Sequence, residues 1–422
     1  MGNQNIKQGM KTLLTLLILM LFSIPFRGGS QINSAQNSIE QKVDRLIHEG
    51  IQNSAFPGAQ VLIFKKDTLR LNKSYGYQTY DSLLPVKNSD LYDLASVTKV
   101  LASTLAFMKL YELYNINLDE KVSNYIPELK RSNKRNSSFK EVLSHSAGWS
   151  PYITHQNTVF RKNGAFKKRT LNFEQNSKYP TQISDSLFIH KNYTKKIIRR
   201  IKRTKVETPG EYVYSGLWFF LLPKLTQQLS GISFNAFLNT YFYSPLGLKR
   251  LTFLPANQFP KNEIIPTEID VYFRKQLVQG WVHDEAAAMM GGISGNAGLF
   301  ANASSIAPLL QLLLQKGSIN DKQFLKPQTI ETFTRRTYPE SKNRRGLGFD
   351  KPTLEIEDPY PSPSVSPESY GHSGFTGTFI WVDPIKSSFV VFLSNRVYPS
   401  RDQRGLYELE IREKLLEITI EN

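Results

Sequence analysis

The pattern of apolar and polar positions predicts regular elements at both ends of the chain. Residues 39–51 repeat apolar side chains at helical spacing. Residues 59–77 and 377–395 each have the residue pattern of a β-hairpin, two strands joined by a short turn. A helical pattern returns at about 405–417, whereas 94–314 is mostly helix and loop. Strands therefore sit near both termini, with a long helical segment between them.

This distribution predicts an α+β fold in which N- and C-terminal strands form one antiparallel sheet with flanking helices. The α/β part takes about residues 39–93 and 346–422, and a mainly helical lobe, about 94–345, is inserted between its halves. One domain thus occupies residues 31–422. A catalytic cleft is expected between the two lobes.

The first 30 residues have a different character. Lys7 and Lys11 precede an uncharged apolar run, 12–26. A helix of that length spans roughly 22 Å at about 1.5 Å per residue, which is shorter than the ~30 Å hydrocarbon core of a membrane. We expect residues 1–30 to be a secretory signal peptide, with a retained N-terminal membrane anchor as the alternative. The protein is then exported to the periplasm.

Composition and charge narrow the classes of function. The 422 residues are 40% hydrophobic, enough for a large core, and the absence of cysteine excludes disulfides, thiolate metal sites and a cysteine nucleophile. The net charge is +17, and residues 161–205 hold fourteen Lys and Arg against Glu174 and Asp185. We expect a basic insertion at about 155–205. It is either a solvated surface or a contact for anionic envelope polymer or lipid, and we expect no nucleic-acid partner.

Candidate chemistry begins in the stretch "LASVTKVLA", which places Ser96 and Lys99 one helical turn apart. Asp93 is positioned to cap the helix in whose first turn Ser96 lies, and the helix dipole there favours negative charge on the serine oxygen. Lys99 lies within reach of that hydroxyl on the same face. The pair is either a small helical residue beside a surface lysine or a nucleophile beside the group that helps remove its proton.

Two later stretches supply possible partners for this pair. Tyr214, in "PGEYVYSGLWFFLL", is either a core tyrosine or a phenol poised to accept the serine proton. In "GHSGFTGTFIW", His372 and Gly374 enter a strand along which a substrate backbone can pair. The N–H groups of Phe375 and Ser96 are candidates for an oxyanion hole.

These three stretches, in this order, resemble the serine β-lactamase and penicillin-binding-protein superfamily, in its class C-like branch. The motifs of that superfamily are S-x-x-K, then Y-x-N, then a K/H-x-G strand. Further likeness lies in "LSHSAGW" (143–149), "YFYSPLGLKRLTF" (241–253) and "GGISGNAGLFANASSIAPLL" (291–310). The resemblance covers about residue 39 to the C-terminus. It is nearest to a bacterial subgroup often fused to family 3 glycoside hydrolases, which implies work on the cell wall.

One position departs from that pattern, because Gly216 stands where Y-x-N has a polar side chain. The departure predicts slower acylation, altered specificity or loss of hydrolysis. Arg344, Arg345 and Arg396 are candidates to clamp a substrate carboxylate, although surface ion pairing is the favoured interpretation for each. His145 and His283 are expected to order loops, and no metal-ligand spacing is present. Asp284 and Glu285 are expected to be structural, since adjacent residues rarely face one cleft.

The sequence thus predicts a metal-free serine hydrolase without a cofactor, in which Ser96 forms an acyl-enzyme on an amide or ester. Tyr214 and Lys99 share the proton transfer, and His372 orients the substrate or its protonation. Cell-wall D-alanyl peptides, small esters and β-lactams are the expected substrate classes, with the peptides favoured. The competing interpretations are a weakened or inactive penicillin-binding-like module that holds anionic envelope polymer, and a β-lactamase.

Overall fold

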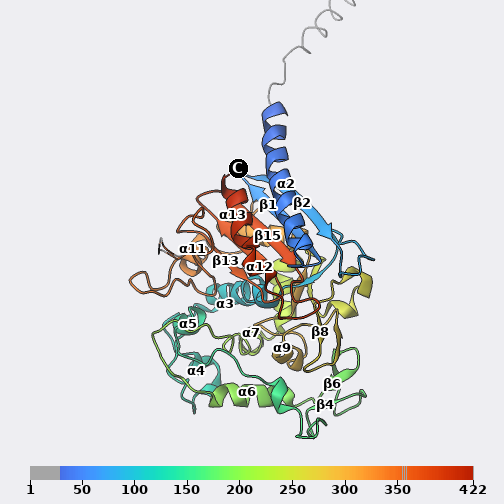
Figure 1. The fold of residues 1–422 in the computed structure, drawn as a ribbon. Coiled ribbons are helices and arrows are strands. Elements are labelled where there is room, and N and C mark those ends of the chain that lie inside the picture. Colours follow the sequence, from blue (N-terminus) through green and yellow to red (C-terminus); the bar gives the residue numbers. More distant parts are fainter. Residues whose placement is uncertain (1–28, 354, 356, 358, 422) are drawn as a thin grey trace, which may run out of the picture.

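A computed structural model describes residues 29–421 except positions 354, 356 and 358. Its largest sheet is antiparallel and has the strand order β13-β14-β15-β1-β2. Both ends of the chain contribute strands to it, so the predicted α+β fold is confirmed (Figure 1). The strands are β1 (Gly58–Lys65), β2 (Thr68–Gly76), β13 (Tyr370–Ser373), β14 (Phe379–Asp383) and β15 (Ser388–Ser394).

Helices cover both faces of this sheet, which explains why its middle strands are apolar on both sides. Val61 and Ile63 of β1 pack with the helices on one face, whereas Leu62 between them packs with the core of the other lobe. The β1–β2 turn places Lys66 and Asp67 at φ values of 49° and 56°. The covering helices are α2 (Gly29–Gln52), α12 (Gly405–Glu408) and α13 (Ile411–Glu421) on the first face and α10 (Ala303–Leu314) on the second.

Two terminal helices differ from the sequence prediction. Helix α2 begins ten residues earlier than the apolar spacing at 39–51 indicated. The single helix expected at 405–417 is instead α12 and α13, and Glu410 between them has a φ of 52°, which interrupts the helix. The predicted signal peptide or anchor lies almost entirely outside the described residues. Among residues 29–421, no helix is both long and apolar enough to span a bilayer.

The inserted lobe contains the predicted helices and, in addition, several short strands. Strands β3, β10 and β7 form one small sheet beside the larger one, and β8–β9 and β11–β12 are short hairpins. The helices are α3 (Leu105–Tyr114), α4 (Val122–Tyr125), α5 (Phe139–Leu143), α7 (Leu222–Ser230), α8 (Phe234–Leu238), α9 (Glu285–Met289) and α11 (Pro327–Thr334). The strands are β3 (Tyr92–Asp93), β7 (Leu251–Phe253), β8 (Glu268–Asp270), β9 (Gln276–Val278), β10 (Leu299–Ala301), β11 (Ser318–Ile319) and β12 (Lys322–Gln323).

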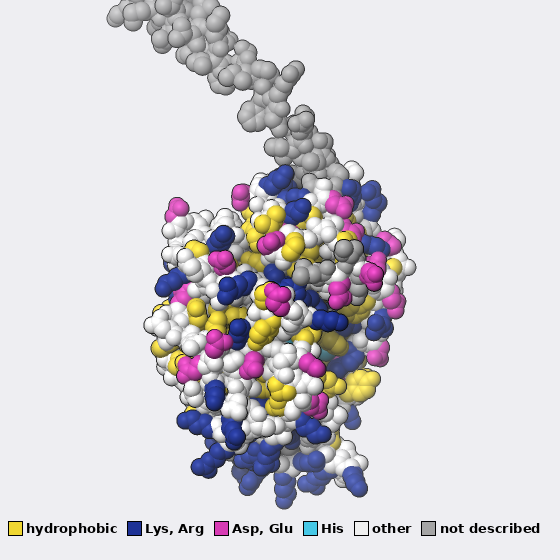
Figure 2. Space-filling view, turned by 90° about the vertical axis from the view of Figure 1, so that its left-hand side faces the viewer, with side chains coloured by type: hydrophobic (Ala, Val, Ile, Leu, Met, Phe, Trp, Pro, Cys, Tyr) yellow, Lys and Arg dark blue, Asp and Glu magenta, His cyan; other side chains and the backbone are white. Residues whose placement is uncertain are grey.

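The basic insertion forms the end of the molecule farthest from the start of α2 (Figure 1). It consists of a three-stranded sheet, in the order β4-β6-β5, followed by helix α6. Lys and Arg side chains crowd this end of the surface (Figure 2). The elements are β4 (Leu171–Asn172), β5 (Thr181–Ser184), β6 (Leu187–Ile189) and α6 (Tyr193–Arg203).

Candidate active site

Ser96 lies in a strained turn that follows β3. The turn is 3₁₀-helical over Ala95–Val97, and Ala95 has a φ of 45°, which is costly for a residue with a side chain. The sequence suggested that Asp93 caps a helix, but in the structure it does not. Its Oδ1 accepts the N–H of Ala95 at 2.8 Å and its Oδ2 accepts the N–H of His283 at 2.6 Å. Asp93 thus holds the turn that presents Ser96.

Lys99 is buried directly beneath the Ser96 hydroxyl. Its Nζ lies 2.8 Å from Ser96 Oγ and donates a second hydrogen bond to the carbonyl of Asn296 at 2.9 Å. Its side chain is 3% exposed, and no carboxylate of the described residues forms an ion pair with it. An ammonium in this position has the serine oxygen as a principal partner, so it stabilises negative charge there.

Tyr214 completes the group on the opposite side of Ser96. Burial raises the pKa of its phenol, but the charges of Lys99 and Arg345, with hydrogen bonds from Ser96 and Lys99, outweigh burial and lower it below the ordinary value of 10.0. Arg345 lies 5.2 Å from the centre of the Tyr214 ring, and His145 stacks obliquely on that ring at 4.5 Å. The surroundings therefore make the phenolate, which is the form able to take a proton from Ser96, easier to form than on a free tyrosine.

His372 lies behind Tyr214 and does not line the cleft. It is 3% exposed, its ring centre is 6.1 Å from that of Tyr214, and its Nδ1 donates to the carbonyl of Ser373 at 2.7 Å. Burial and the charges of Arg345 and Lys99 lower its pKa to about 3. His372 is thus neutral, with an unprotonated Nε2 that has no hydrogen-bond partner. Its expected role in orienting the substrate or its protonation stays a prediction, and from this position it would act through Tyr214.

The loop after β13 forms the other half of the expected oxyanion hole. A Cβ at Gly374 would lie 2.6 Å from the carbonyl oxygen of Leu94, so only glycine allows this loop to approach the Ser96 turn. The hydroxyls of Thr376 and Thr378 donate to the carbonyls of Asp93 and Leu94, at 2.7 and 2.9 Å. These bonds hold the backbone that follows Phe375 against the backbone that precedes Ser96. The two candidate N–H donors are brought to one region by this packing.

A cleft of about 560 Å³ opens over the Ser96 hydroxyl. Gly216 lies in its wall, and no atom lies within 4 Å of the position that a Cβ would take there, so the missing polar side chain leaves open space. Asp284 and Glu285 both line the cleft, contrary to the expectation that adjacent residues would not share it. They do so because α9 begins there: Asp284 Oδ1 caps the helix by accepting the N–H of Ala287 at 2.7 Å.

The candidate carboxylate clamps do not line this cleft. Arg344 forms a two-pronged ion pair with Asp350, at 2.8 and 3.2 Å, and Arg345 also pairs with Asp350. Arg396 is 3% exposed, packs on the ring of Phe375 at 4.7 Å and donates to backbone carbonyls. The ion pairs match the interpretation that the sequence favoured, and Arg396 has a structural role in place of one as a clamp. The arginine that does line the cleft is Arg401.

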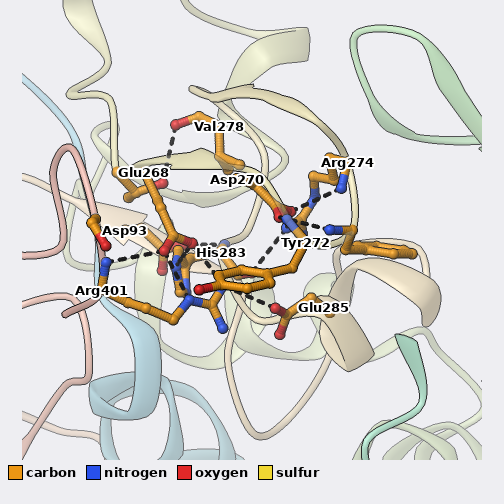
Figure 3. Close-up of polar contacts among 12 residues, drawn as sticks. Asp93, Glu268, Asp270, Tyr272, Arg274, Val278, His283, Glu285 and Arg401 are labelled. Carbon is orange, nitrogen blue, oxygen red and sulfur yellow. Dashed lines mark hydrogen bonds and ion pairs between the residues drawn. The ribbon is translucent and has the colours of Figure 1, made fainter. Parts of the chain in front are cut away.

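Arg401 belongs to a buried network that supports the serine turn (Figure 3). Its guanidinium contacts Glu268 at 2.6 and 2.8 Å and Glu285 at 2.9 Å. Glu268 also bonds Nε2 of His283 at 2.8 Å, and the backbone of His283 reaches Asp93. His283 and His145 thus order loops, as the sequence predicted. Within the described residues no cluster of His, Asp or Glu is arranged to hold a metal ion.

The family follows from comparison with known proteins. The family model described as Beta-lactamase matches residues 43–413. The chain belongs to the beta-lactamase family. The resemblance drawn from the three motifs is therefore confirmed, and the protein is a serine hydrolase. The narrower likeness to the subgroup fused to glycoside hydrolases stays a prediction.

Relatives of this beta-lactamase family member include a protein of Salmonella agona (strain SL483) named "Putative D-alanyl-D-alanine carboxypeptidase". It is 31% identical over 389 residues, which are 84% of this chain and 83% of the relative. Among solved structures, "EstCE1, a hydrolase with promiscuous acyltransferase activity" superposes with a TM-score of 0.65 at 18% identity, covering 90% of this chain and 99% of the other. A penicillin-binding protein homolog from Caulobacter crescentus gives 0.62 at 16% identity, covering 90% and 97%. The two structures show the shared fold.

Sequence reasoning gave His145 and Asn296 no role at this family's site and considered Arg345 only as a candidate carboxylate clamp, yet all three contact the reacting groups. Arg345 approaches the Tyr214 ring, His145 stacks on it, and the carbonyl of Asn296 accepts from Lys99. His145 and Asn296 lie within "LSHSAGW" and "GGISGNAG", two stretches that support the family resemblance. The resemblance therefore drew attention to these stretches, but it did not indicate which groups the two residues contact. Arg345 had no local signal to distinguish it from Arg344.

Replacing Arg345 with methionine tests its effect on the phenol. A charge within about 6 Å shifts a pKa by roughly one unit or more, so losing it should raise the pKa of Tyr214. We expect the acid limb of kcat/KM against pH to move upward by about one unit, with roughly tenfold lower activity at neutral pH and recovery at high pH. The control is Arg344→Met, which removes the other arginine that pairs with Asp350. Arg344 lies over the ring of Tyr360, at 4.4 Å, and not over that of Tyr214. Equal profiles for the two variants would contradict the assignment.

Proposed function

We propose that this protein is an exported hydrolase of cell-wall D-alanyl peptides that works through an acyl-enzyme on Ser96. The observation that carries the proposal is the buried ammonium of Lys99 at 2.8 Å from Ser96 Oγ, at the base of an open cleft. The name of the relative that shares 31% of its residues supports a D-alanyl peptide as substrate. The uncharged run behind Lys7 and Lys11 supports export.

In the proposed reaction the phenolate of Tyr214 accepts the proton of Ser96 as Oγ attacks the peptide carbonyl. Lys99 donates a hydrogen bond to Oγ and offsets the negative charge that develops there. The N–H groups of Ser96 and Phe375 receive the carbonyl oxygen as it becomes an oxyanion. Tyr214 then returns the proton to the amine of the departing D-alanine. In the second half of the reaction, water attacks the acyl carbonyl, Tyr214 accepts its proton, and the proton then passes to Ser96 Oγ as the acyl group is released.

The test measures adduct formation and product release with the full chain and three substrates. These are an N-acylated peptide ending in D-Ala-D-Ala, an aryl ester of a simple acid, and benzylpenicillin. We expect an acyl adduct on Ser96 by intact mass and release of D-alanine at a higher kcat/KM than turnover of the other two. The same peptide ending in L-alanine is the stereochemical control, and Ser96→Ala provides the blank.

Each remaining outcome contradicts the proposal in a different way. Faster turnover of penicillin would identify a β-lactamase, and turnover of the ester alone would identify an esterase. Equal release of D- and L-alanine would show that the cleft does not recognise the peptide end. An absence of any adduct on folded protein would indicate a non-catalytic module of the penicillin-binding type.

A further inference from the structure

The basic insertion contains a cationic hollow of about 720 Å³ that lies outside the candidate active site. It is formed where the loop before β5 and the loop after β6 run together, the N–H of Lys191 donating to the carbonyl of Lys178 at 3.0 Å. The first turns of α6 complete its wall. Seven of its lining residues are lysine or arginine: Lys168, Arg169, Lys178, Lys191, Lys195, Lys196 and Arg199.

The charge of this hollow is not compensated by the protein. None of the fourteen Lys and Arg side chains of residues 161–205, all of which are described, forms an ion pair. The nearby acid Asp185 pairs instead with Lys261, from outside the insertion. Lys196 is bonded only to the carbonyl of Arg169, at 2.7 Å. Like charges gathered in this way repel one another, so a bound anion would relieve the repulsion.

A buried donor adds a specific feature to this charge. His190 lines the hollow and is 8% exposed. Its Nδ1 accepts the N–H of Asn192 at 3.1 Å, so in the neutral ring the proton is on Nε2, for which the structure provides no partner. Burial and the charges of Lys196 and Arg169 lower the pKa of His190, which keeps it in that neutral form at pH 7. Tyr179 holds the imidazole in place edge-on, at 5.3 Å.

We propose that this hollow binds a polymer bearing repeated phosphate or carboxylate groups. A single small anion would meet only a few of the exposed cations, each of which contributes little by itself in water. A chain of anions meets many of them at once, and its later contacts are made at high effective concentration. Lys and Arg side chains gather at the lower end of the surface, where the insertion lies (Figure 2).

Three observations favour a polymer over a membrane surface. Helix α6 is amphipathic, but its apolar side chains pack against the lobe and are not available to enter a bilayer: Tyr193, Ile197 and Ile201 are buried, and Ile198 is partly buried. Within residues 161–205 the one large apolar side chain that is exposed is Phe173. The binding region is also concave, which suits a chain that lies along it.

The hollow is connected to the cleft by short structural links. Residues 151–154 and Gln156, where the insertion begins, line the cleft. Asp185, after β5, accepts the indole N–H of Trp281 at 2.9 Å, two residues before His283 in the cleft wall. The insertion that carries the hollow thus also contributes to the wall of the cleft. Binding of a polymer in the hollow is independent of which peptide or ester the serine cleaves.

The experiment compares two charge-matched triple variants of the full chain. The hollow variant is Lys178→Gln, Lys191→Gln and Lys195→Gln, and the control is Lys162→Gln, Lys167→Gln and Lys205→Gln, which lie in the same insertion outside the hollow. Binding of fluorescein-labelled polyphosphate and poly-glutamate is measured by anisotropy across a salt series. We expect the hollow variant to bind at least one of the two about tenfold more weakly and with a smaller salt slope, since each cation that contacts a polyanion adds to that slope. The control should change less than threefold.

Three results would overturn the proposal. Equal weakening of both variants would show diffuse attraction without a site. Inorganic phosphate that competes as tightly as the polymer would show a site for a single anion. Binding to vesicles of phosphatidylglycerol and phosphatidylcholine, with no affinity for either polymer, would show a membrane surface. Turnover of a small soluble ester should be equal in both variants, which separates this site from the catalytic one.

Discussion

Replacing Lys99 with methionine should slow the acylation of Ser96 by about 10³-fold or more. The ammonium lies 2.8 Å from Ser96 Oγ and also lowers the pKa of Tyr214, so its loss removes charge stabilisation at the nucleophile and at its base together. A thousandfold change corresponds to about 4 kcal/mol in the barrier. Methionine has similar length and no charge, and it suits a side chain that is almost fully buried. The rate is measured from single-turnover formation of the acyl adduct by intact mass.

The control for this variant is Lys134→Met. Lys134 is also buried, donates to the carbonyl of Thr204, and lies 5.6 Å from an aromatic ring, as Lys99 does from that of Phe219. It differs in being distant from the cleft lining. Similar thermal stability of the two variants with a rate loss confined to Lys99→Met would support its catalytic role. A loss below tenfold at Lys99 would refute the proposed chemistry.

Replacing Glu268 with glutamine should destabilise the fold by about 3 kcal/mol at neutral pH. Burial raises the pKa of Glu268, but hydrogen bonds from Arg401 and His283, with their charges, lower it to about 2. The carboxylate is 2% exposed, and glutamine leaves Arg401 without its main counter-charge. A difference of about two units from the unfolded value is worth roughly 3 kcal/mol.

The sign of this effect determines its pH dependence. A pKa that is lower in the folded state stabilises the protein above the unfolded pKa, near 4.5, and that stability is lost as the pH falls toward about 2. The urea midpoints of wild type and Glu268→Gln should therefore differ most at pH 6 and lie closer together at pH 3, where more than half of the contribution is lost. Glu263→Gln, in a part-exposed pair with Arg250, is the control and should cost less than about 1 kcal/mol. A constant difference at both pH values would exclude the linkage.

The two strand pairs near the termini were predictable because burial on a sheet leaves a period-two pattern. Val61, Leu62 and Ile63 send side chains to alternate faces, and both faces are covered, which produces the apolar run that was seen. The strands within 94–345 escaped prediction, since pieces of two or three residues carry no period. The break between α12 and α13 depends on one left-handed residue, Glu410, which the apolar pattern does not mark.

The side-chain positions that the sequence missed at the site have a common physical cause. The motif of His372 borders a strand and gave no sign that packing turns the ring behind Tyr214 and leaves it neutral. Asp284 and Glu285 were kept out of the cleft on local grounds, but the start of α9 presents both to it. Whether a side chain faces a cavity depends on how its element is oriented, and adjacent positions in a chain do not determine that.

By itself the sequence determined the pairing of Ser96 with Lys99, because residues three apart on a helical turn share a face whatever surrounds them. It also determined the strand alternation and the charge of the insertion. Only the tertiary structure decided that Arg345 and His145 surround the phenol of Tyr214, that Asp93 holds the serine turn through His283, and that the insertion's cations line a hollow. Local geometry follows from covalent connection, whereas the electrostatic environment of a group is the sum of contacts from distant segments, which packing alone brings together.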